Sequence, residues 1–499
     1  MVEPRPGART LMTPTATTAS ALETILAGAA TAYASWAQAT RADRASALNA
    51  VADRLDAAAD ELVTLAQVET HLPEGRLRGE LKRTTFQLRI FGEVLTEGSY
   101  LDARIDHADP DWPMGAPRPD LRRQLEPLGP VVVFAASNFP FAFSVAGGDT
   151  AAALAAGCSV VLKAHSGHPQ LSQRTGELVV EALEAVGAPD GLFAVIFGTE
   201  SGRTALLDPR VKAGSFTGSI PGGRALFDLA SSRPEPIPFY GELGSTNPVF
   251  VTENADAARA EAIAEQFLGS MTMGAGQFCT KPGVLFVPEG SSIPTVLQRL
   301  AKPAAAPLLN QRIQTGYVSV LDERLSHPDI TVLARDDAAL ADPPSPTILQ
   351  TNIDALLADL DGLFAECFGP TALIVTYADE SQLLEVARTI DGQLTATIVG
   401  EGDEAVLPEL VRLLARRAGR LLWNQWPTGV SVTYAQQHGG PYPATTAAGT
   451  TSVGTAAITR FLRPVAYQGF PQGLLPDELT DAPQTSIPRR VDGQLTLPE

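Results

Sequence analysis

The sequence predicts an α/β protein built on doubly wound parallel sheets, and three observations support this class. Short β-branched runs alternate with helical stretches from residue 128 onward, which is the pattern of parallel strands joined by crossover helices. With 44% hydrophobic and 19% charged residues, the composition is that of a globular chain. A length of 499 residues without an internal repeat allows about two to four domains.

The first hundred residues are predicted to be helical. Apolar residues at three-and-four spacing indicate helices over 21–39, 41–71 and 73–97. Residues 1–19 lack the apolar run of a signal peptide and predict a disordered leader, with either Met1 or Met12 as the true start. The polar, proline-rich segment 98–127 predicts a connector or a hairpin arm.

The alternating region follows. Strands are predicted over 129–134, 159–163, 192–197 and 213–216. Helices are predicted over 149–156 and 169–186 between them. A second α/β stretch begins near residue 247, with a long helix over 256–273, a glycine-rich loop and a strand–helix pair over 371–388.

Polar clusters mark the carboxyl ends of three predicted strands. They are Ser137-Asn138, the segment 163–166 and the segment 216–219. Ligands of doubly wound sheets bind beyond these strand ends. The sequence therefore predicts a binding crevice at that edge.

The formal charge is −19 and the pI is near 4.8, so the chain repels phosphate backbones and anionic lipids. Nucleic acid and membrane surfaces are therefore not expected partners, and an anionic ligand must be held by local cations. Three cysteines without a CxxC spacing argue against a disulfide framework and favour a reducing, cytoplasmic setting.

Cys279 is the first candidate for chemistry. It lies in a loop with glycines at 274, 276 and 283, whose exposed backbone N–H groups predict a reachable thiol of lowered pKa. A buried structural cysteine is the alternative. Cys158 and Cys367 lie against apolar segments and are interpreted as structural.

Glu242 and Asn138 are candidates at strand ends. Glu242 stands between glycines after a strand predicted over 237–240, and partial burial there is expected to raise its pKa toward that of a useful base. Asn138 follows the strand 129–134 and can offer its NH₂ to a developing oxyanion. The alternatives are a surface glutamate at a turn and a turn asparagine.

Weaker candidates concern anion binding. Lys163 ends an apolar strand, so it is either a phosphate or ribose contact or an exposed strand end. Phe216-Thr217-Gly218-Ser219 leads into a helix whose free N–H groups can bind phosphate. His165 and His168 lie on a loop with no carboxylate or cysteine partner nearby, so no metal site is predicted.

Together these pieces resemble the aldehyde dehydrogenase superfamily, from about residue 20 to the tail. The matching motifs are Ser137-Asn138-Phe139-Pro140, Phe216-Thr217-Gly218-Ser219, Glu242-Leu243-Gly244, Gly276-Gln277-Phe278-Cys279 and Glu366-Cys367-Phe368-Gly369-Pro370. The resemblance implies two doubly wound Rossmann-like domains plus a small β oligomerisation arm. It places the cofactor domain at 20–110 and 128–243, the catalytic domain at 244–435, and the arm at 98–127 and 463–499. A homodimer or homotetramer is implied.

The resemblance also implies roles. Cys279 attacks the aldehyde to give a thiohemiacetal and then a thioester, while Asn138 and the Cys279 backbone N–H hold the oxyanion. Glu242 activates the hydrolytic water. Cofactor contacts are implied for Lys163, Ser219, Phe216, Gly218, Glu366 and Phe368. Of these, Glu366 holds the nicotinamide ribose, Phe368 packs beside the nicotinamide, Ser219 meets the pyrophosphate and Lys163 the adenosine ribose.

Cofactor choice follows from one position. Members that prefer NAD often carry a glutamate three residues after the lysine, where this chain has Ser166. Without that carboxylate, Lys163, Ser166 and Arg203 can bind a 2′-phosphate. The expected cofactor is therefore NADP, with NAD possible.

A narrower likeness concerns the branch that oxidises 2,5-dioxopentanoate to 2-oxoglutarate. It rests on segments 137–150, 163–165, 233–238 and 438–446. The chain departs from that branch at Leu243, Lys281 and Gln425-Trp426. The substrate carboxylate needs a cation, which the sequence does not identify.

Three other functions compete. One is an NADP-dependent enzyme for other aliphatic or biosynthetic aldehydes. The second is a hydrolase using Cys279, Glu242 and Lys163, and the third is a catalytically silent binding protein.

Overall fold

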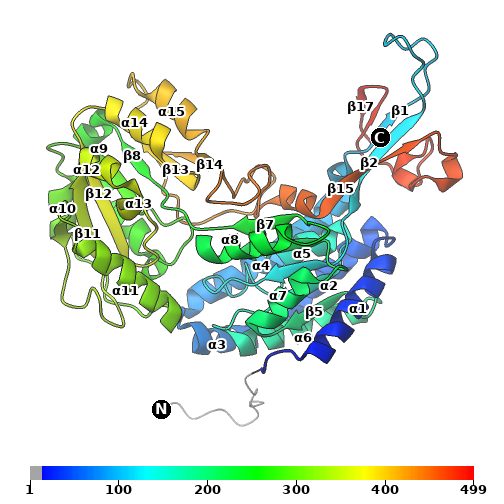
Figure 1. Ribbon diagram of the computed structural model, residues 1–499, viewed down its shortest axis with the longest axis horizontal. Helices are drawn as coiled ribbons and strands as arrows, with labels where there is room; N and C mark the ends of the chain where they lie inside the picture. The colour runs from blue at the N-terminus through cyan, green and yellow to red at the C-terminus, as the bar shows by residue number, and fades with distance from the viewer. Residues whose placement is uncertain (1–13, 499) are drawn as a thin grey trace.

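The computed structural model describes residues 14–498, and this part of the chain forms three β-sheets (Figure 1). One sheet has the strand order β5-β4-β3-β6-β7, the second β10-β11-β12-β9-β8-β13-β14, and the third β15-β2-β1-β16-β17. The first sheet is parallel throughout, and in the second only β10 is antiparallel to its neighbour. The predicted fold class, two doubly wound sheets with a small β arm, is confirmed.

The amino-terminal helices lie on both sides of the first sheet: the first packs Leu22 and Leu26 with Val132 and Phe134 on one face, and the other three belong to the core on the opposite face. They are α1 (Ala19–Trp36), α2 (Arg41–Ala57), α3 (Ala59–Thr70) and α4 (Glu74–Glu97). The single helix predicted over 41–71 is wrong, because Ala58 leaves helical geometry at φ −98° and ψ 12°. The break redirects α3 so that Leu62 and Ala66 remain in the core.

The predicted leader of residues 1–19 lies mostly outside the described residues. Within the described part, Thr17 donates its backbone N–H to Phe197 O at 2.9 Å. The Thr18 side chain caps α1 by accepting from Ala21 N. Residues 17 and 18 are thus attached to the first sheet and to α1.

The first sheet alternates strictly with helices. Its strands are β3 (Val131–Phe134), β4 (Val160–Lys163), β5 (Phe193–Ile196), β6 (Ala213–Thr217) and β7 (Phe239–Glu242). Its helices are α5 (Gly148–Ala156), α6 (Pro169–Ala185), α7 (Thr199–Leu207) and α8 (Ile220–Ser231). Phe134 pairs in register with Lys163 on one side and with Phe216 on the other, so the carboxyl ends of these strands are level. The strand order reverses between β3 and β6, which is where doubly wound sheets bind ligands.

The second sheet is buried on both faces and its central strands are almost continuously apolar. Its strands are β8 (Val249–Val251), β9 (Val284–Pro288), β10 (Thr331–Ala334), β11 (Thr347–Asn352), β12 (Thr371–Tyr377), β13 (Gln393–Val399) and β14 (Ala418–Trp423). Its helices are α9 (Glu253–Thr272), α10 (Ile293–Arg299), α11 (Gln311–Leu325), α12 (Ile353–Ala358), α13 (Leu360–Leu363), α14 (Ser381–Thr389) and α15 (Leu407–Leu414). Within residues 14–498, no helix combines the length and apolarity of a membrane span.

The third sheet projects away from the other two at the upper right of Figure 1. Its strands are β1 (Arg104–Asp106), β2 (Leu121–Pro127), β15 (Leu462–Gln468), β16 (Arg489–Val491) and β17 (Gln494–Thr496). Exposed apolar side chains gather on the segments of this arm: Trp112, Met114, Phe470, Leu474, Leu495 and Leu497.

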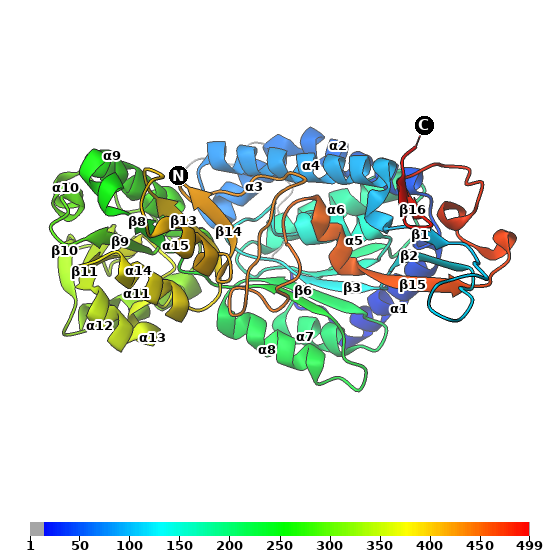
Figure 2. The same cartoon turned by 90° about the horizontal axis from the view of Figure 1, so that it is seen from above.

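Residues 424–461, here called the returning segment, connect β14 to β15. The segment is drawn in orange and brown, and it crosses from the second sheet to the first (Figures 1 and 2). There it is bonded along β7, since Leu243 N donates to Ala444 O and Thr446 N donates to Gly241 O. This crossing brings side chains remote in sequence to the end of β7.

Candidate active site

Cys279 lies on a glycine-rich loop between α9 and β9. Gly274 and Gly276 adopt positive φ angles of 58° and 70°, which glycine tolerates best. A Cβ on Gly276 would stand 2.1 Å from the carbonyl oxygen of Gly369. The glycines thus let the loop pack directly on the turn that follows Cys367, with the Cys279 side chain half-buried.

Two buried side chains hold the cysteine loop in place. Asn247, at φ 54°, donates its Nδ2 to the carbonyl oxygens of Cys279 at 2.8 Å and Lys281 at 3.0 Å. Lys281 Nζ donates to the carbonyls of Cys367 and Thr371, each at 2.7 Å. Asn247 was not a predicted site residue, because nothing in its local sequence indicates that it bonds a loop more than thirty residues away.

Asn138 faces the same loop from the first sheet. It follows β3, is buried, and donates its Nδ2 to Gln277 O at 3.2 Å. Its own carbonyl accepts from Arg76 Nη2 at 2.7 Å. Glu80 of α4 accepts from the backbone N–H groups of the next turn and so fixes this loop against the helix. The Asn138 amide therefore reaches the loop of Cys279 across the interface of the two sheets.

Glu242 is the last residue of β7, rather than a residue beyond the strand as predicted. Its Oε1 lies 2.8 Å from His438 Nε2, and its Oε2 accepts from the Ser452 hydroxyl. Both partners belong to the returning segment and are buried. The sequence contains His438 within a motif, but its role was missed, since only the fold brings it to Glu242.

His438 also contacts the thiol. Its Nε2 is 3.6 Å from Cys279 Sγ, and the three ligand atoms of Glu242, Cys279 and His438 lie within 4.8 Å of one another. A nucleophile beside an imidazole that is itself beside a carboxylate is an arrangement suited to proton transfer.

The protonation states differ from the sequence-based expectation. Burial raises the pKa of the Cys279 thiol, and the carboxylates of Glu242 and Glu366 raise it further, so the predicted low-pKa thiol is wrong. Burial also favours a raised pKa at Glu242, but His438 and Ser452 outweigh it and bring its pKa below 4.5. The raised Glu242 pKa was therefore also wrong: the resting site holds a thiol and a carboxylate, and the thiol needs a base to release its proton.

Lys163 ends β4, Ser166 lies on the loop that follows, and Arg203 lies within α7. The stem of Lys163 packs on Gly202, where a Cβ would stand 2.9 Å from Lys163 Cγ. Burial lowers the pKa of Lys163, and the nearby Arg312 lowers it further. Ser166 is exposed on the loop after β4, and Arg203 is exposed with its Nε 3.9 Å from Glu200. Because Glu242 and Cys279 contact His438, the Cys–Glu–Lys arrangement of a hydrolase has no counterpart in these contacts.

The Phe216 to Ser219 motif forms the entrance to α8. Ser219 is the N-cap, and its Oγ accepts from Gly222 N at 3.4 Å. The Phe216 ring lies over Gly218, where a Cβ would stand 2.5 Å from Cζ. The helix therefore directs its first N–H groups toward the strand-order switch between β3 and β6, an arrangement that suits a pyrophosphate.

Glu366 and Phe368 lie on the turn before β12, which packs against the cysteine loop. The Glu366 carboxylate rests on Gly244, where a Cβ would stand 2.4 Å from Oε2. Burial raises the pKa of Glu366 to about 7, against the opposing effect of Lys281. Phe368 is half-buried on the same turn. A helix entrance, a lysine and a carboxylate seated on glycines fit a dinucleotide laid across the strand ends.

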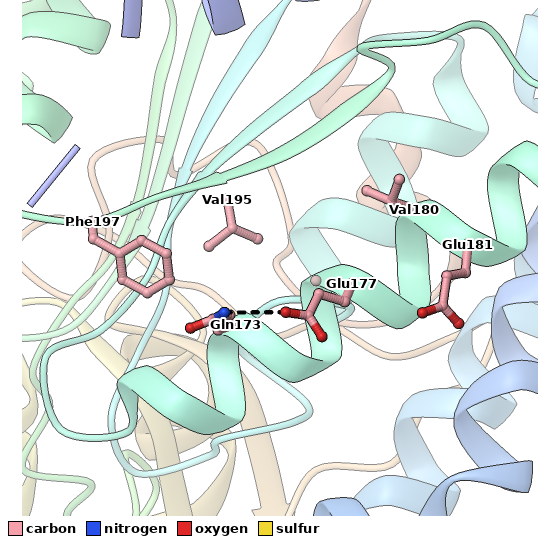
Figure 3. Close-up of a pocket in the computed structure, with 7 residues that line it drawn as sticks. Gln173, Glu177, Val180, Glu181, Val195 and Phe197 are labelled. Atoms are coloured by element: carbon pink, nitrogen blue, oxygen red, sulfur yellow. Dashed lines mark hydrogen bonds between the residues drawn. The ribbon is translucent and has the colours of Figure 1, made fainter. Parts of the chain in front are cut away.

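Two other features are separate from this site. His168 donates to or accepts from Ser172 Oγ at 3.0 Å and lies 2.9 Å from Ala136 O, so both its ring nitrogens are engaged within the fold. A hollow of about 420 Å³ lies between α6 and β5, with Glu177 and Glu181 beside Val195 and Phe197 (Figure 3). No predicted site residue lines this hollow, and its carboxylates disfavour an anionic ligand.

The comparisons with known proteins agree with this arrangement. The model of the aldehyde dehydrogenase family matches residues 1–316. An α-ketoglutaric semialdehyde dehydrogenase of Acinetobacter baylyi is 45% identical over 93% of this chain and 89% of its own. A second enzyme of that name, from Azospirillum brasilense, is 44% identical over 91% of this chain and 87% of its own. The chain therefore belongs to the aldehyde dehydrogenase family and is an oxidoreductase acting on aldehydes.

Solved structures share the fold. The succinic semialdehyde dehydrogenase of Streptococcus pyogenes, in complex with NADP⁺, superposes with a TM-score of 0.76 at 19% identity, over 92% of this chain and 96% of that one. PnpE from a Pseudomonas species superposes with a TM-score of 0.74 at 22% identity, over 91% of this chain and 90% of that one. At these identities the likeness concerns the fold.

Proposed function

We propose that this protein oxidises 2,5-dioxopentanoate to 2-oxoglutarate with a nicotinamide dinucleotide. The observation that carries the proposal is the cluster of Cys279, His438 and Glu242 at the ligand-binding edge of a doubly wound sheet. The substrate is supported by the names of the two relatives at 45% and 44% identity.

The residues supply the steps around the reacting carbon. Cys279 Sγ adds to the aldehyde, and the Asn138 NH₂ and the Cys279 backbone N–H stabilise the oxyanion. When bound, the dinucleotide supplies the acceptor for the hydride that leaves this carbon. Glu242 then takes a proton from the water that attacks the thioester, which releases the acid and restores the thiol. The sum is one aldehyde and one water converted to one acid, with a hydride and a proton released.

His438 is assigned the proton transfer at the thiol. Because the pKa of Cys279 is raised, the attacking thiolate forms only if a base accepts its proton. His438 Nε2 lies 3.6 Å from Sγ and 2.8 Å from Glu242 Oε1, so in the tautomer that leaves Nε2 unprotonated it can accept the thiol proton and then donate it to Glu242. The Glu242 carboxylate thereby offsets the positive charge of the protonated imidazole.

NADP is the preferred cofactor in this proposal. Ser166 stands on the loop after β4 without a carboxylate that would repel a 2′-phosphate. Lys163, Arg203 and Arg312 supply positive charge around it, with Lys163 affected by Arg312. Higher initial rates with NADP than with NAD support this choice, and the reverse order contradicts it.

We further propose that the arm assembles the protein as a homodimer or homotetramer. A thin mixed sheet that projects from the body and exposes apolar side chains such as Leu474 and Leu495 is typical of a surface covered by another subunit. Light scattering of the purified protein tests this directly, and a monomer contradicts it.

The central test measures reduced dinucleotide formed from 2,5-dioxopentanoate by the wild type and by Cys279→Ala. The wild type is expected to turn over, and the variant to lose about 10⁴-fold or more in kcat. Cys158→Ala is the control, since Cys158 is buried and donates to Phe461 O away from the crevice. Equal activity of wild type and Cys279→Ala would overturn the proposed function.

A further inference from the structure

One face of α4 carries buried and half-buried polar side chains whose hydrogen-bond partners are incomplete. Arg76, Glu80, Arg83 and Gln87 follow each other at spacings of four, three and four, which places them on the same helix face. Each has a buried polar atom without a hydrogen-bond partner among the described residues: Arg76 Nε and Nη1, Glu80 Oε2, Arg83 Nη1 and Gln87 Nε2. Buried polar groups are nearly always partnered, so a row of such atoms indicates a place where a ligand or water binds.

Arg83 connects this face to the catalytic centre. Its Nε donates to Val430 O at 3.3 Å, and its guanidinium lies 5.4 Å from the centre of the Phe143 ring. The Phe143 ring is 6.5 Å from that of His438. Burial lowers the pKa of Arg83, while Glu80, Cys279 and Glu242 oppose this effect. Arg83 is therefore a half-buried cation close enough to the thiol to interact with it.

Arg420 reaches the same place from β14. Its guanidinium donates to Pro427 O at 2.7 Å and to Gly429 O at 3.2 Å, while its Nε is buried and has no hydrogen-bond partner in the part of the chain that the structure describes. Gly429 N in turn donates to Thr280 Oγ1 at 3.3 Å, beside the nucleophile. Burial lowers the pKa of Arg420, and Cys279 opposes this. Arg83 and Arg420 thus bond adjacent residues of the returning segment next to Cys279.

Within residues 14–498, neither arginine has a carboxylate within 4 Å, although the chain carries a net charge of −19. Two half-buried guanidiniums, each with a buried nitrogen that has no partner among the described residues, favour an anion close to both, since an unsatisfied buried N–H of a charged group is costly. Arg76 differs, because its guanidinium lies between the Phe139 and Phe278 rings and donates to Asn138 O. We therefore assign Arg76 to positioning the loop that carries Asn138.

We propose that Arg83 and Arg420 form the subsite that binds the carboxylate end of the substrate. The proposal rests on the proposed function, because it places the aldehyde carbon at Cys279 and the carboxylate at the far end of a five-carbon chain. Guanidinium groups bind planar carboxylates with paired N–H donors, and the 2-oxo group beside the carboxylate accepts a further hydrogen bond. The substrate class is thus a short aldehyde with a terminal carboxylate or 2-oxo acid.

The test compares an anionic and a neutral aldehyde of equal length. The measured quantity is kcat/KM for 2,5-dioxopentanoate divided by kcat/KM for pentanal, in wild type, Arg83→Met and Arg420→Met. We expect this ratio to fall about 30-fold in each variant, the size of a lost hydrogen bond to a charged group. Using the ratio cancels any change in the Cys279 thiol, because both aldehydes need it equally.

The control is Arg78→Met on the outer face of α4. Arg78 is exposed and pairs with Glu74 and Asp60 at 2.7 and 2.8 Å, so its loss should leave the ratio unchanged. Arg83→Lys keeps the charge and should recover part of the ratio, which a purely structural role would not predict. If Arg420→Met fails to fold, the comparison of Arg83→Lys with Arg83→Met still tests the subsite.

A binding measurement complements the kinetics. Glutarate, a dicarboxylate without an aldehyde, should inhibit pentanal oxidation competitively in the wild type and about 30-fold more weakly in Arg83→Met. A ratio that stays within about threefold of wild type in both methionine variants, together with an unchanged inhibition constant in Arg83→Met, overturns the subsite. Failure of the wild type to oxidise either aldehyde would instead refute the proposed function.

Discussion

Two regions contribute to the catalytic centre in different ways. The strand-end edge consists of the carboxyl ends of β3, β4, β6 and β7, with Asn138, Lys163, Ser219 and Glu242 at or just beyond them. The returning segment, residues 424–461, has no regular strand or α-helix before β15, yet it supplies His438 and Ser452 to Glu242. Each residue of the edge is positioned by the strand that directly precedes or contains it. The residues of the returning segment reach the site only because the fold brings that segment against β7.

The difference explains how the charge states arise. At the edge alone, burial would raise the pKa of Glu242 and leave a weak, protonated acid. The returning segment supplies an imidazole and a hydroxyl that reverse this effect. The same ionised Glu242 then raises the pKa of Cys279, so the two regions together set which group carries the proton.

Of the changes in these two regions, the largest effect is expected at the edge, from Glu242→Gln. Removing the general base should lower kcat by about 10²- to 10⁴-fold, because water is then no longer deprotonated as it attacks the thioester. Steady-state kinetics on the dioxo acid provide the measurement, and Glu235→Gln, at an exposed glutamate paired with Lys212, is the matched control. A loss below about tenfold would remove Glu242 from the role of base.

A smaller but substantial effect is expected in the returning segment, from His438→Gln. Without the imidazole the thiol loses the base that lies 3.6 Å from Sγ, so kcat/KM should fall by about 10- to 100-fold, with partial recovery at high pH as the thiol ionises unaided. His327→Gln, at a histidine 3.4 Å from Asp359 in the second sheet's domain, is the control. If His438→Gln shows the pH profile of the wild type, His438 takes no part in proton transfer and the returning segment only packs against the site.

Cofactor choice tests the edge by itself. Ser166→Glu places a carboxylate where a 2′-phosphate is proposed to bind, and the ratio of kcat/KM for NADP to that for NAD should fall about tenfold or more. The change should leave the catalytic steps with saturating NAD intact. An unchanged ratio would mean that the phosphate lies elsewhere and would leave Lys163 and Ser166 without the proposed role.

The smallest effect is expected from Ser452→Ala, which removes one hydrogen bond to Glu242. Because that bond lowers the pKa of the carboxyl, its loss should raise this pKa, and the acid limb of kcat/KM should move to higher pH. At pH 8, where the carboxyl is ionised in both proteins, we expect a change below about threefold. Thr459→Ala, an exposed hydroxyl in the same segment, is the control, and an acid limb moved to lower pH contradicts the assignment.

The contrast also explains what the sequence could predict. The family, the doubly wound sheets and the strand-end positions followed from short motifs such as Phe216-Thr217-Gly218-Ser219, because each motif combines a strand, a turn and a helix start in a few residues. The sequence did not predict the role of His438 or the hydrogen bond from Asn247 to Cys279 O, since both depend on contacts between distant segments. The pKa directions of Cys279 and Glu242 were wrong for the same reason: each is set by neighbours brought by the fold.

The pH dependence of Cys279 alkylation is the most direct test of the cluster that Cys279, His438 and Glu242 form. Mass spectrometry separates its alkylation from that of Cys158 and Cys367. For the wild type the alkylation rate should still be rising at pH 9, because burial and the two carboxylates keep the thiol protonated. In Glu242→Gln the midpoint should move to lower pH, since one negative neighbour is gone. A wild-type midpoint near neutral pH, or a midpoint that Glu242→Gln leaves unmoved, would contradict the account.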